Sequence, residues 1–416
     1  MKCVAYTIKF IRVKSLLLLS IVALTINVGY AQNFEFSNNR KKDAINMILV
    51  KNLIIIPVLI NEKGPFNFIL DTGVGPMIIS DPSITDSLKI KDLRTIKIAG
   101  LGKGNEIEAY VSSSIHARVG KASMDHVPTA LLKEDLFRLS SFVGMPVHGL
   151  LGYHFFKSFI VELKYSAKRI IFYLPSHGKK IKGERIPLEM INDKPYTKIQ
   201  IESPELGTLI LKVLVDNGAS HAISLEILNK NPFPLPPVSI LANLGVGLGG
   251  PISGHIGRLP SIKVGSFELK NVLSSYPKYE EVAAKVLVND RNGNLGADIL
   301  SRFDITMDYE DGAMYLRKNG NFKRPFQHDM AGMEIFMEDN QHKRFFIGRI
   351  EPNSPAEEGG LEADDEIVYL NFVPASNYSL TEMNKVFRDG DDKTVIVTIL
   401  RKGDLRIRVI KLKQRI

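Results

Sequence analysis

Two stretches of sequence decide the fold of this chain: FNFILDTG at Phe66–Gly73 and VLVDNG at Val213–Gly218. In each stretch an apolar run typical of a β-strand leads directly into an aspartate, a small polar residue and a glycine. An aspartate at the end of an apolar strand is costly to bury unless its carboxylate is needed. Asp71 and Asp216 lie 145 positions apart, so the two stretches mark equivalent places in a duplicated chain.

Other landmarks downstream keep nearly the same spacing and the same order. They are Val119-Gly120 with Val264-Gly265 at an offset of 145, and Leu151-Gly152 with Leu295-Gly296, Phe159 with Phe303 and Tyr165 with Tyr309 at an offset of 144. A slippage of at most one residue indicates two homologous lobes in one chain, which gene duplication and fusion explain most simply.

Length and composition are those of an ordinary globular protein of two or three domains. The 416 residues are 44% hydrophobic and 24% charged, which excludes the disordered and fibrous classes. The formal net charge of +9 includes four basic residues among the first 31 positions. The remaining excess is mild and gives no indication of a nucleic-acid partner.

The first residues have the pattern of a secretory signal peptide. Four basic residues precede or flank an apolar run from Leu16 to Leu24, and the small residues Gly29 and Ala31 follow at a cleavage-site spacing. We expect cleavage after Ala31 and a periplasmic or secreted protein with no stable membrane span. A membrane anchor is the alternative, but the apolar run is shorter than the roughly 20 residues that a span needs.

Cysteine chemistry is absent from the predicted mature chain. The one cysteine, Cys3, lies before the apolar run and would be removed with the signal peptide. Disulfides, thiolate nucleophiles and thiolate metal ligands are therefore excluded after cleavage. The nine histidines show no metal-ligand spacing, and we expect neither a metal nor a cofactor.

Short apolar runs broken by turn residues fill two long segments, residues 54–173 and 186–316, and predict mostly β structure in both. A short helix is expected from Leu131 to Ser141. Polar stretches at 177–184 and 318–329 separate the segments from each other and from the last 90 or so residues. Those last residues predict two strands, a helix with a Ser379 and Glu382 capping box, and two final strands.

The aspartate pair favours metal-free amide hydrolysis. If the two lobes face each other, Asp71 and Asp216 become neighbours, and two close carboxyls cannot both ionise comfortably, so one proton is shared. The ionised member can activate a water and the protonated member can stabilise the oxyanion. Alone, each triplet is also an ordinary turn sequence, but a chance turn has no reason to recur at the equivalent place.

The segment from Ile54 to Leu316 resembles the aspartic peptidases of the retropepsin and pepsin type. The resemblance rests on both triplets, on the apolar residues and serine that follow each, and on Leu150-Leu151-Gly152. It implies that Asp71 and Asp216 are the catalytic dyad, supported by Thr72, Gly73, Asn217 and Gly218.

This chain departs from the family pattern in the second triplet and beside both triplets. Asn217 stands where the family has a hydroxyl residue that helps to lock the two active-site loops together. Val74 and Ala219 stand three residues after the aspartates, where pepsins have hydroxyl residues, so we expect a working pH nearer neutral. The glycine-rich stretches Gly100–Gly104 and Gly245–Gly250 would be flaps over a peptide cleft or plain surface hairpins.

The last residues, from about Ala331, resemble a PDZ domain of the bacterial type, which binds extended C-terminal peptides beside a sheet edge. The resemblance implies that the carboxylate loop and binding strand are formed by Ala331, Gly332, Met333, Glu334 and Ile335. The expected architecture is mainly β, two homologous acid-protease lobes followed by an α+β PDZ domain. Its parts are a signal peptide at 1–31, lobes at 32–177 and 178–325, and the PDZ domain at 326–416.

Three functional hypotheses follow from these features. The first is an exported aspartic endopeptidase that acts on peptides or proteins and uses its PDZ domain to bind peptides. The second is a non-catalytic peptide-binding protein that lost activity through Asn217. The third is an envelope scaffold in which the PDZ domain alone carries the function.

Overall fold

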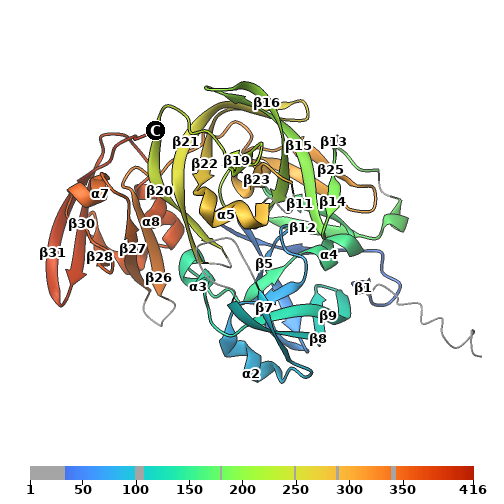
Figure 1. The fold of residues 1–416 in the computed structure, drawn as a ribbon. Coiled ribbons are helices and arrows are strands. Elements are labelled where there is room, and N and C mark those ends of the chain that lie inside the picture. The colour runs from blue at the N-terminus through green and yellow to red at the C-terminus, as the bar shows by residue number, and fades with distance from the viewer. Residues whose placement is uncertain (1–32, 99–106, 179, 248–249, 287–289, 339–342) are drawn as a thin grey trace, which may run out of the picture. The chain divides into compact units, whose positions relative to one another are not determined.

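The computed structural model describes residues 33–98, 107–178, 180–247, 250–286, 290–338 and 343–416. The expected signal peptide and the glycine stretch Gly100–Gly104 lie outside the described residues, as do Leu248 and Gly249. No helix in the described part of the chain is long and apolar enough to cross a membrane. Strands predominate over helices (Figure 1).

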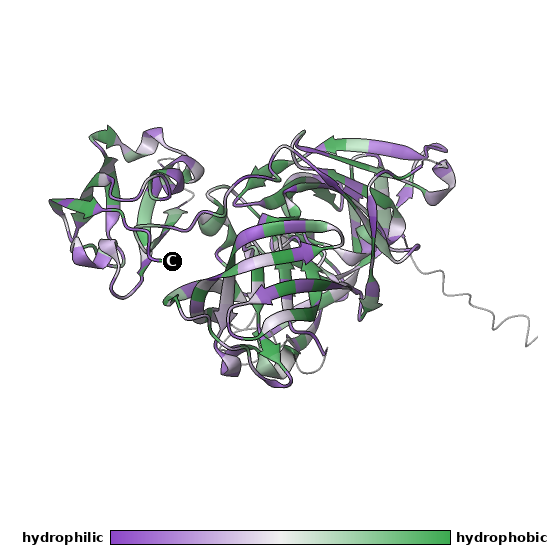
Figure 2. Ribbon diagram, turned by 90° about the horizontal axis from the view of Figure 1, so that it is seen from above, coloured by the Kyte–Doolittle hydropathy of each residue, from purple (hydrophilic) through white to green (hydrophobic). Residues whose placement is uncertain are grey.

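The first half of the chain builds a sheet whose described strands run in the order β1-β9-β6-β10-β5-β4-β8-β7, with β3 paired to β4. Strands with alternating hydrophilic and hydrophobic bands are visible in the protein (Figure 2), and the alternating burial along much of β8 is expected where one face packs on a core. The strands are β1 (Glu35–Phe36), β3 (Ile48–Val50), β4 (Leu53–Ile60), β5 (Lys63–Leu70), β6 (Met77–Ile79), β7 (Arg94–Ile98), β8 (Ile107–Val119), β9 (Ala122–Leu132) and β10 (Gly149–Leu151).

The second half builds a sheet in the order β14-β15-β16-β23-β17-β22-β21-β20 within the described residues. A separate two-stranded sheet is formed by β18 (Ile227–Leu228) and β19 (Asn231–Pro232), which lie between β17 and β20 in the sequence. The strands of the large sheet are β14 (Glu189–Ile191), β15 (Lys194–Ser203), β16 (Gly207–Asp216), β17 (Ile223–Leu225), β20 (Ser239–Gly247), β21 (Gly250–Val264), β22 (Phe267–Pro277) and β23 (Gly293–Gly296).

The two sheets repeat the same strand pairings around the aspartates. In the first, β10 is parallel to β5 and antiparallel to β6, while β6 is parallel to β9. In the second, β23 is parallel to β16 and antiparallel to β17, while β17 is parallel to β22. The register also corresponds, because Leu150 pairs with Ile69 as Asn294 pairs with Leu214. The topology therefore agrees with the repeat in the sequence.

A third sheet joins the two halves, in the order β13-β25-β24-β11-β12-β2. At its centre β11 of the first half pairs with β24 of the second, with Leu163 opposite Ile305. One continuous hydrophobic core, which includes Phe172 and Phe303, runs through both halves. The strands are β2 (Lys42–Asn46), β11 (Ile160–Lys164), β12 (Arg169–Tyr173), β13 (Glu184–Pro187), β24 (Phe303–Asp308) and β25 (Ala313–Lys318).

The helices of both halves are short. The expected helix from Leu131 to Ser141 is wrong in its bounds, because Leu131 and Leu132 are buried as the end of β9, and the helix begins only at Leu139. The described helices here are η1 (Pro82–Ile84), α2 (Thr85–Leu88), α3 (Leu139–Val143), α4 (Tyr153–Ser158), η2 (Pro175–His177), α5 (Tyr279–Val286) and α6 (Ala297–Leu300).

The last residues form their own sheet, in the order β26-β27-β28-β30-β31 with β29 paired to β28, over a core of their own. The predicted capping box is present: Ser379 accepts from the Glu382 backbone and the Glu382 side chain accepts from the Ser379 backbone. The elements are β26 (Met333–Glu338), β27 (Arg344–Ile350), α7 (Pro355–Glu358), β28 (Glu366–Leu370), β29 (Val373–Pro374), η4 (Ala375–Asn377), α8 (Leu380–Val386), β30 (Thr394–Arg401) and β31 (Asp404–Lys411).

Candidate active site

Each aspartate leaves the end of a buried strand beside a glycine of the parallel neighbour. Strand β5 is exposed at its start and buried at its end, just before Asp71, whose backbone N–H donates to Leu151 O at 2.8 Å. A Cβ on Gly152 would overlap the backbone oxygens of Asp71 and Val74. Only glycine permits this close approach of two backbones, which explains why a glycine follows the apolar pair in Leu150-Leu151-Gly152.

Reciprocal hydrogen bonds lock the two aspartate loops together. Thr72 N donates to Asn217 Oδ1 at 2.7 Å, and Asn217 N donates to Thr72 Oγ1 at 3.1 Å. Each side chain also donates across to the opposite strand end, Thr72 Oγ1 to Val215 O at 2.7 Å and Asn217 Nδ2 to Leu70 O at 3.0 Å. Thr72 and Asn217 are both fully buried, so Asn217 serves in the interlock as a matching partner of Thr72.

The two carboxyls face each other across this interlock. A Cβ on Gly218 would overlap the carboxyl of Asp71, and a Cβ on Gly73 would lie 3.1 Å from Cγ and Oδ1 of Asp216. Each aspartate accepts from the glycine of its own triplet, Gly73 N to Asp71 Oδ1 at 2.7 Å and Gly218 N to Asp216 Oδ1 at 3.1 Å. The structure therefore brings together all six of the predicted catalytic and supporting residues.

Burial favours the protonated form of Asp71. Its side chain is removed from solvent, and this desolvation raises its pKa well above the ordinary range, with the charge of Asp216 adding to the effect. The Gly73 hydrogen bond and the nearby cation Lys194 oppose the rise without cancelling it. One shared proton on a pair of close carboxyls is the state that acid–base hydrolysis needs.

Several ionisable residues around the dyad had no signal in the local sequence. Lys194, at the start of β15, interacts electrostatically with both aspartates, and burial lowers its pKa. Glu226 and Arg291 form a buried bidentate ion pair, with nitrogen–oxygen distances of 3.0 and 3.1 Å. His221 is buried close to Asp216, and burial lowers its pKa. Pairing of β15 and β23 with β16 brings Lys194 and Arg291 to the site from distant parts of the sequence, which explains why sequence spacing did not find them.

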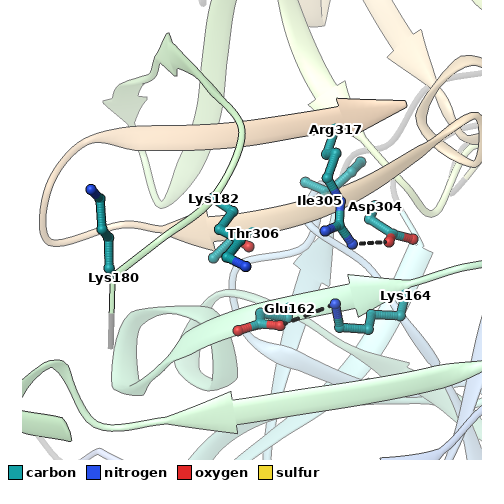
Figure 3. Close-up of a pocket in the computed structure, with 8 residues that line it drawn as sticks. All are labelled: Glu162, Lys164, Lys180, Lys182, Asp304, Ile305, Thr306 and Arg317. Carbon is teal, nitrogen blue, oxygen red and sulfur yellow. Dashed lines mark hydrogen bonds and ion pairs between the residues drawn. The ribbon is translucent and has the colours of Figure 1, made fainter. Parts of the chain in front are cut away.

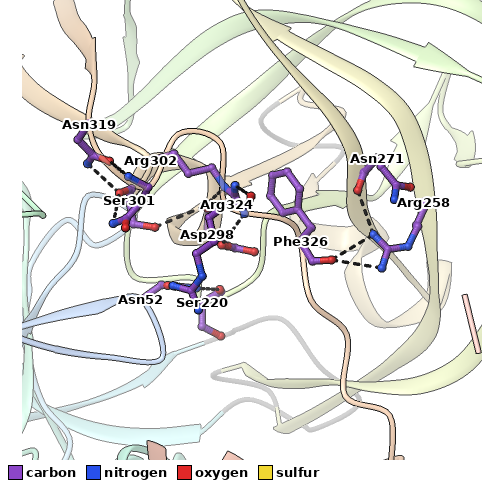
Figure 4. Close-up of polar contacts among 11 residues, drawn as sticks. Asn52, Ser220, Arg258, Asn271, Asp298, Ser301, Arg302, Asn319, Arg324 and Phe326 are labelled. Atoms are coloured by element: carbon purple, nitrogen blue, oxygen red, sulfur yellow. Dashed lines mark hydrogen bonds and ion pairs between the residues drawn. The ribbon is translucent and has the colours of Figure 1, made fainter. Parts of the chain in front are cut away.

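The β3–β4 hairpin of the first half reaches the active-site loop of the second. Asn52 Nδ2 donates to Ser220 O at 3.3 Å (Figure 4). Close to it, Arg302 contacts Asp298 and the backbone oxygen of Arg324, which lies after β25 (Figure 4). These contacts tie the loop that carries Asp216 to the rest of the protease-like part.

A charged cavity lies away from the dyad, on the sheet that joins the two halves (Figure 3). Two ion pairs line it, Lys164 with Glu162 at 3.4 Å and Arg317 with Asp304 at 2.7 Å. It contains neither aspartate of the dyad, and its lining keeps a positive excess because Lys180 and Lys182 join these two ion pairs. Among the described residues, no group of three or more histidine, cysteine or acidic side chains could hold a metal ion.

The predicted PDZ residues lie in one loop and one strand, but an internal carboxylate occupies the loop. Ala331 N and Gly332 N donate to Asp329 Oδ1 at 3.1 and 2.6 Å, and Met333 N lies 3.4 Å from the same oxygen. Glu334 and Ile335 belong to β26, which ends the sheet. A peptide carboxylate would therefore have to displace Asp329, a residue that sequence reasoning missed.

The turn before β28 contains Asp364-Asp365 at the place where the PDZ pattern that the sequence resembles usually has Gly-Asp. Asp364 adopts a left-handed conformation with φ of 68°, which aspartate tolerates better than most residues with a Cβ. Asp365 is buried and pairs with the guanidinium of Arg401 at 2.6 and 2.7 Å. The substitution thus preserves the turn.

Comparisons with known proteins agree with this geometry. Residues 56–155 match the family model described as aspartyl protease, and residues 321–400 match the model described as PDZ domain. A search of curated protein sequences found no match. The chain therefore contains a retropepsin-like aspartyl protease domain and a PDZ domain, and it is mainly β. The resemblances drawn from the sequence are confirmed at this level.

Proposed function

We propose that this protein is an exported aspartic endopeptidase that cleaves peptide bonds with Asp71 and Asp216. The observation that carries the proposal is the reciprocal interlock between Thr72 and Asn217, which holds two carboxyls face to face. A fold that had lost catalysis would have no need to keep a buried carboxyl, Asp71, in contact with a second, half-buried carboxyl, Asp216. The match to the aspartyl protease family supports a hydrolase.

The reaction proceeds by proton transfer between the dyad, a water and the scissile amide. The oxygen of a water held between the carboxyls attacks the carbonyl carbon while ionised Asp216 takes one of its protons. The proton of Asp71 passes to the carbonyl oxygen, giving a neutral tetrahedral diol. The C–N bond then breaks as Asp216 returns its proton to the nitrogen and Asp71 recovers one from a diol hydroxyl. The dyad ends as it began.

The PDZ domain would hold an extended segment of the substrate beside β26. This strand ends the described sheet and the short helix α3 packs against it, so a peptide that added a further strand at this edge would have to displace α3. The Asp329 carboxylate already satisfies the loop amides, and this favours internal segments over free C-termini. Edge addition needs only backbone hydrogen bonds, which any extended peptide supplies.

Export rests on the N-terminal sequence pattern alone. The proposed cleavage after Ala31 would release the protein into the periplasm or the medium. Mass spectrometry of the N-terminus of the protein recovered from cells tests this step: a mature chain that begins at Gln32 supports it, and a chain that keeps its first 31 residues contradicts it.

Cleavage of unstructured protein by residues 32–416 tests the proposed activity. The wild type would be compared with Asp71→Asn and Asp216→Asn between about pH 3 and about pH 8, with cleavage sites mapped by mass spectrometry. We expect cleavage by the wild type and by neither variant. Identical product profiles from all three proteins would contradict the proposal and favour a peptide-binding protein without catalysis.

A further inference from the structure

The two carboxyls of the dyad differ in the number of hydrogen bonds they accept. Asp216 accepts at both oxygens: Gly218 N donates to Oδ1 at 3.1 Å and Asn294 Nδ2 donates to Oδ2 at 2.9 Å. Asp71 accepts from Gly73 N at Oδ1 and shares a hydrogen bond with the side chain of Asp216, and among the described residues no amide side chain donates to it as Asn294 does to Asp216. Each donor stabilises the ionised form of the carboxyl that accepts from it. The donors therefore stabilise the ionised form of Asp216 more than that of Asp71.

The inequality comes from one position in the repeat. Asn294 in β23 corresponds to Leu150 in β10, since each pairs with the residue two before the aspartate of its half. Leu150 packs among apolar side chains, including Ile78, and has no group to donate. Asn294 is buried, and its amide is directed at Asp216. Asn294 thus stands where the first copy has an apolar residue, and it places a donor on the dyad.

The other groups around Asp216 do not remove this inequality. The titratable groups that act on it electrostatically are Asp71, Lys194, Tyr196, His221, Glu226, Arg291 and Tyr309. Glu226 and Arg291 neutralise each other in their ion pair. Burial raises the pKa of both tyrosines and lowers that of His221, so these three stay neutral near pH 7. Lys194 and Asp71 remain, and a cation there also favours an ionised Asp216.

We propose that Asn294 is a positioning residue that keeps Asp216 ionised and leaves the shared proton on Asp71. The inference rests on the proposed function for its catalytic meaning, because it fixes which carboxyl takes the proton of the attacking water. The hydrogen-bond asymmetry itself is independent of whether the protein cleaves peptides. Asn294 acts through Asp216 and does not touch the substrate in this role.

Two readouts on the mature chain, residues 32–416, test the proposal. The first is the titration of the Asp71 and Asp216 carboxyl carbons by NMR with ¹³C-labelled aspartate, assigned with Asp71→Asn and Asp216→Asn. The second is the acid limb of the pH dependence of kcat/KM. We expect Asn294→Leu to raise the midpoint of Asp216 ionisation, and with it the acid limb, by about one to two pH units.

Two further variants separate positioning from structural damage. Asn292→Leu is the matched control, because Asn292 bonds Lys212 N and Ile227 O two positions away but does not touch the dyad. It should lower stability without moving the titration. Asn294→Asp keeps the shape and adds a charge, and should raise the Asp216 midpoint further than Asn294→Leu does.

The outcomes separate this inference from the proposed function. An NMR shift in Asn294→Leu with no cleavage by the wild type would support the positioning role and overturn the proposed function. Cleavage by the wild type, with titrations of Asn294→Leu that match those of Asn292→Leu, would overturn the positioning role and leave the proposed function intact.

Discussion

Removal of the Asn217 side chain should destabilise the protease-like part strongly. Asn217→Ala deletes the acceptor of Thr72 N and the donor to Leu70 O, and both backbone groups are buried at the centre of the interlock. An unsatisfied buried group costs about 1 to 3 kcal/mol. We therefore expect the free energy of unfolding to fall by about 2 to 5 kcal/mol, and the loss of alignment to lower kcat/KM by about 10²-fold.

Asn217→Thr should recover much of this loss. A threonine hydroxyl both donates and accepts, so it can donate to Leu70 O and accept from Thr72 N. Thr72 Oγ1 already does the same, because it donates to Val215 O and accepts from Asn217 N. The natural control is Asn231→Ala, since Asn231 is exposed and bonds only the nearby Asn229 O at 3.0 Å. We expect a change within about 0.5 kcal/mol for that variant.

Urea unfolding followed by far-UV circular dichroism measures the change, because the chain has no tryptophan to report by fluorescence. Hydrogen exchange of the amides in β5 and β16 assigns the loss to the protease-like part and excludes the PDZ domain as its source. An Asn217→Ala variant as stable as Asn231→Ala would refute the interlock as the element that holds the two loops.

Four other substitutions have defined outcomes. Gly218→Ala should lower kcat/KM at least about 10²-fold, while Gly73→Ala, whose Cβ has more room, should keep more activity; equal losses would contradict the geometry. Burial raises the pKa of Asp71 in the folded protein. The contribution of this carboxyl to stability is therefore complete below its pKa in the unfolded chain, and it is lost as pH rises through its pKa in the folded protein. Asp71→Asn should thus be more stable than the wild type by about 0.5 to 2 kcal/mol at neutral pH, and this gain should disappear below about pH 4. Thermal unfolding of both proteins at neutral pH and below about pH 4 measures the difference. Asp329→Ala should free two loop amides, those of Ala331 and Gly332. The variant should then bind a peptide with a free C-terminus more tightly than the same peptide with an amidated C-terminus, as measured by calorimetry. An affinity for the free C-terminus that does not change would show that this loop does not bind carboxylates.

The proximity of the two aspartates was predictable from sequence because each aspartate carries a local pattern that recurs in the second half. Asp71 and Asp216 both follow an apolar strand and precede a glycine, and the repeat implied that they meet. The role of Asn217 was harder to predict. Its amide reaches Thr72 and Leu70 in the other half, and only the geometry shows that it takes the place of a hydroxyl.

The remaining features of the site depend on long-range pairing that no local pattern reveals. Asn294 lies 78 positions from Asp216 and meets it only because β23 runs beside β16. Lys194 reaches the dyad from the start of β15. The misplaced helix has a similar cause, since the burial of Leu131 in a parallel pairing with β6 and of Leu132 in an antiparallel pairing with β8 outweighs their helical propensity.

A double-variant cycle on the dyad tests the central claim most directly. The rate of peptide cleavage would be measured for the wild type, Asp71→Asn, Asp216→Asn and the variant that carries both changes. Groups that act as a unit lose their effect together, so we predict that each single change costs as much as both. Single losses that add up in the double variant, or cleavage that survives both changes, would contradict a shared dyad.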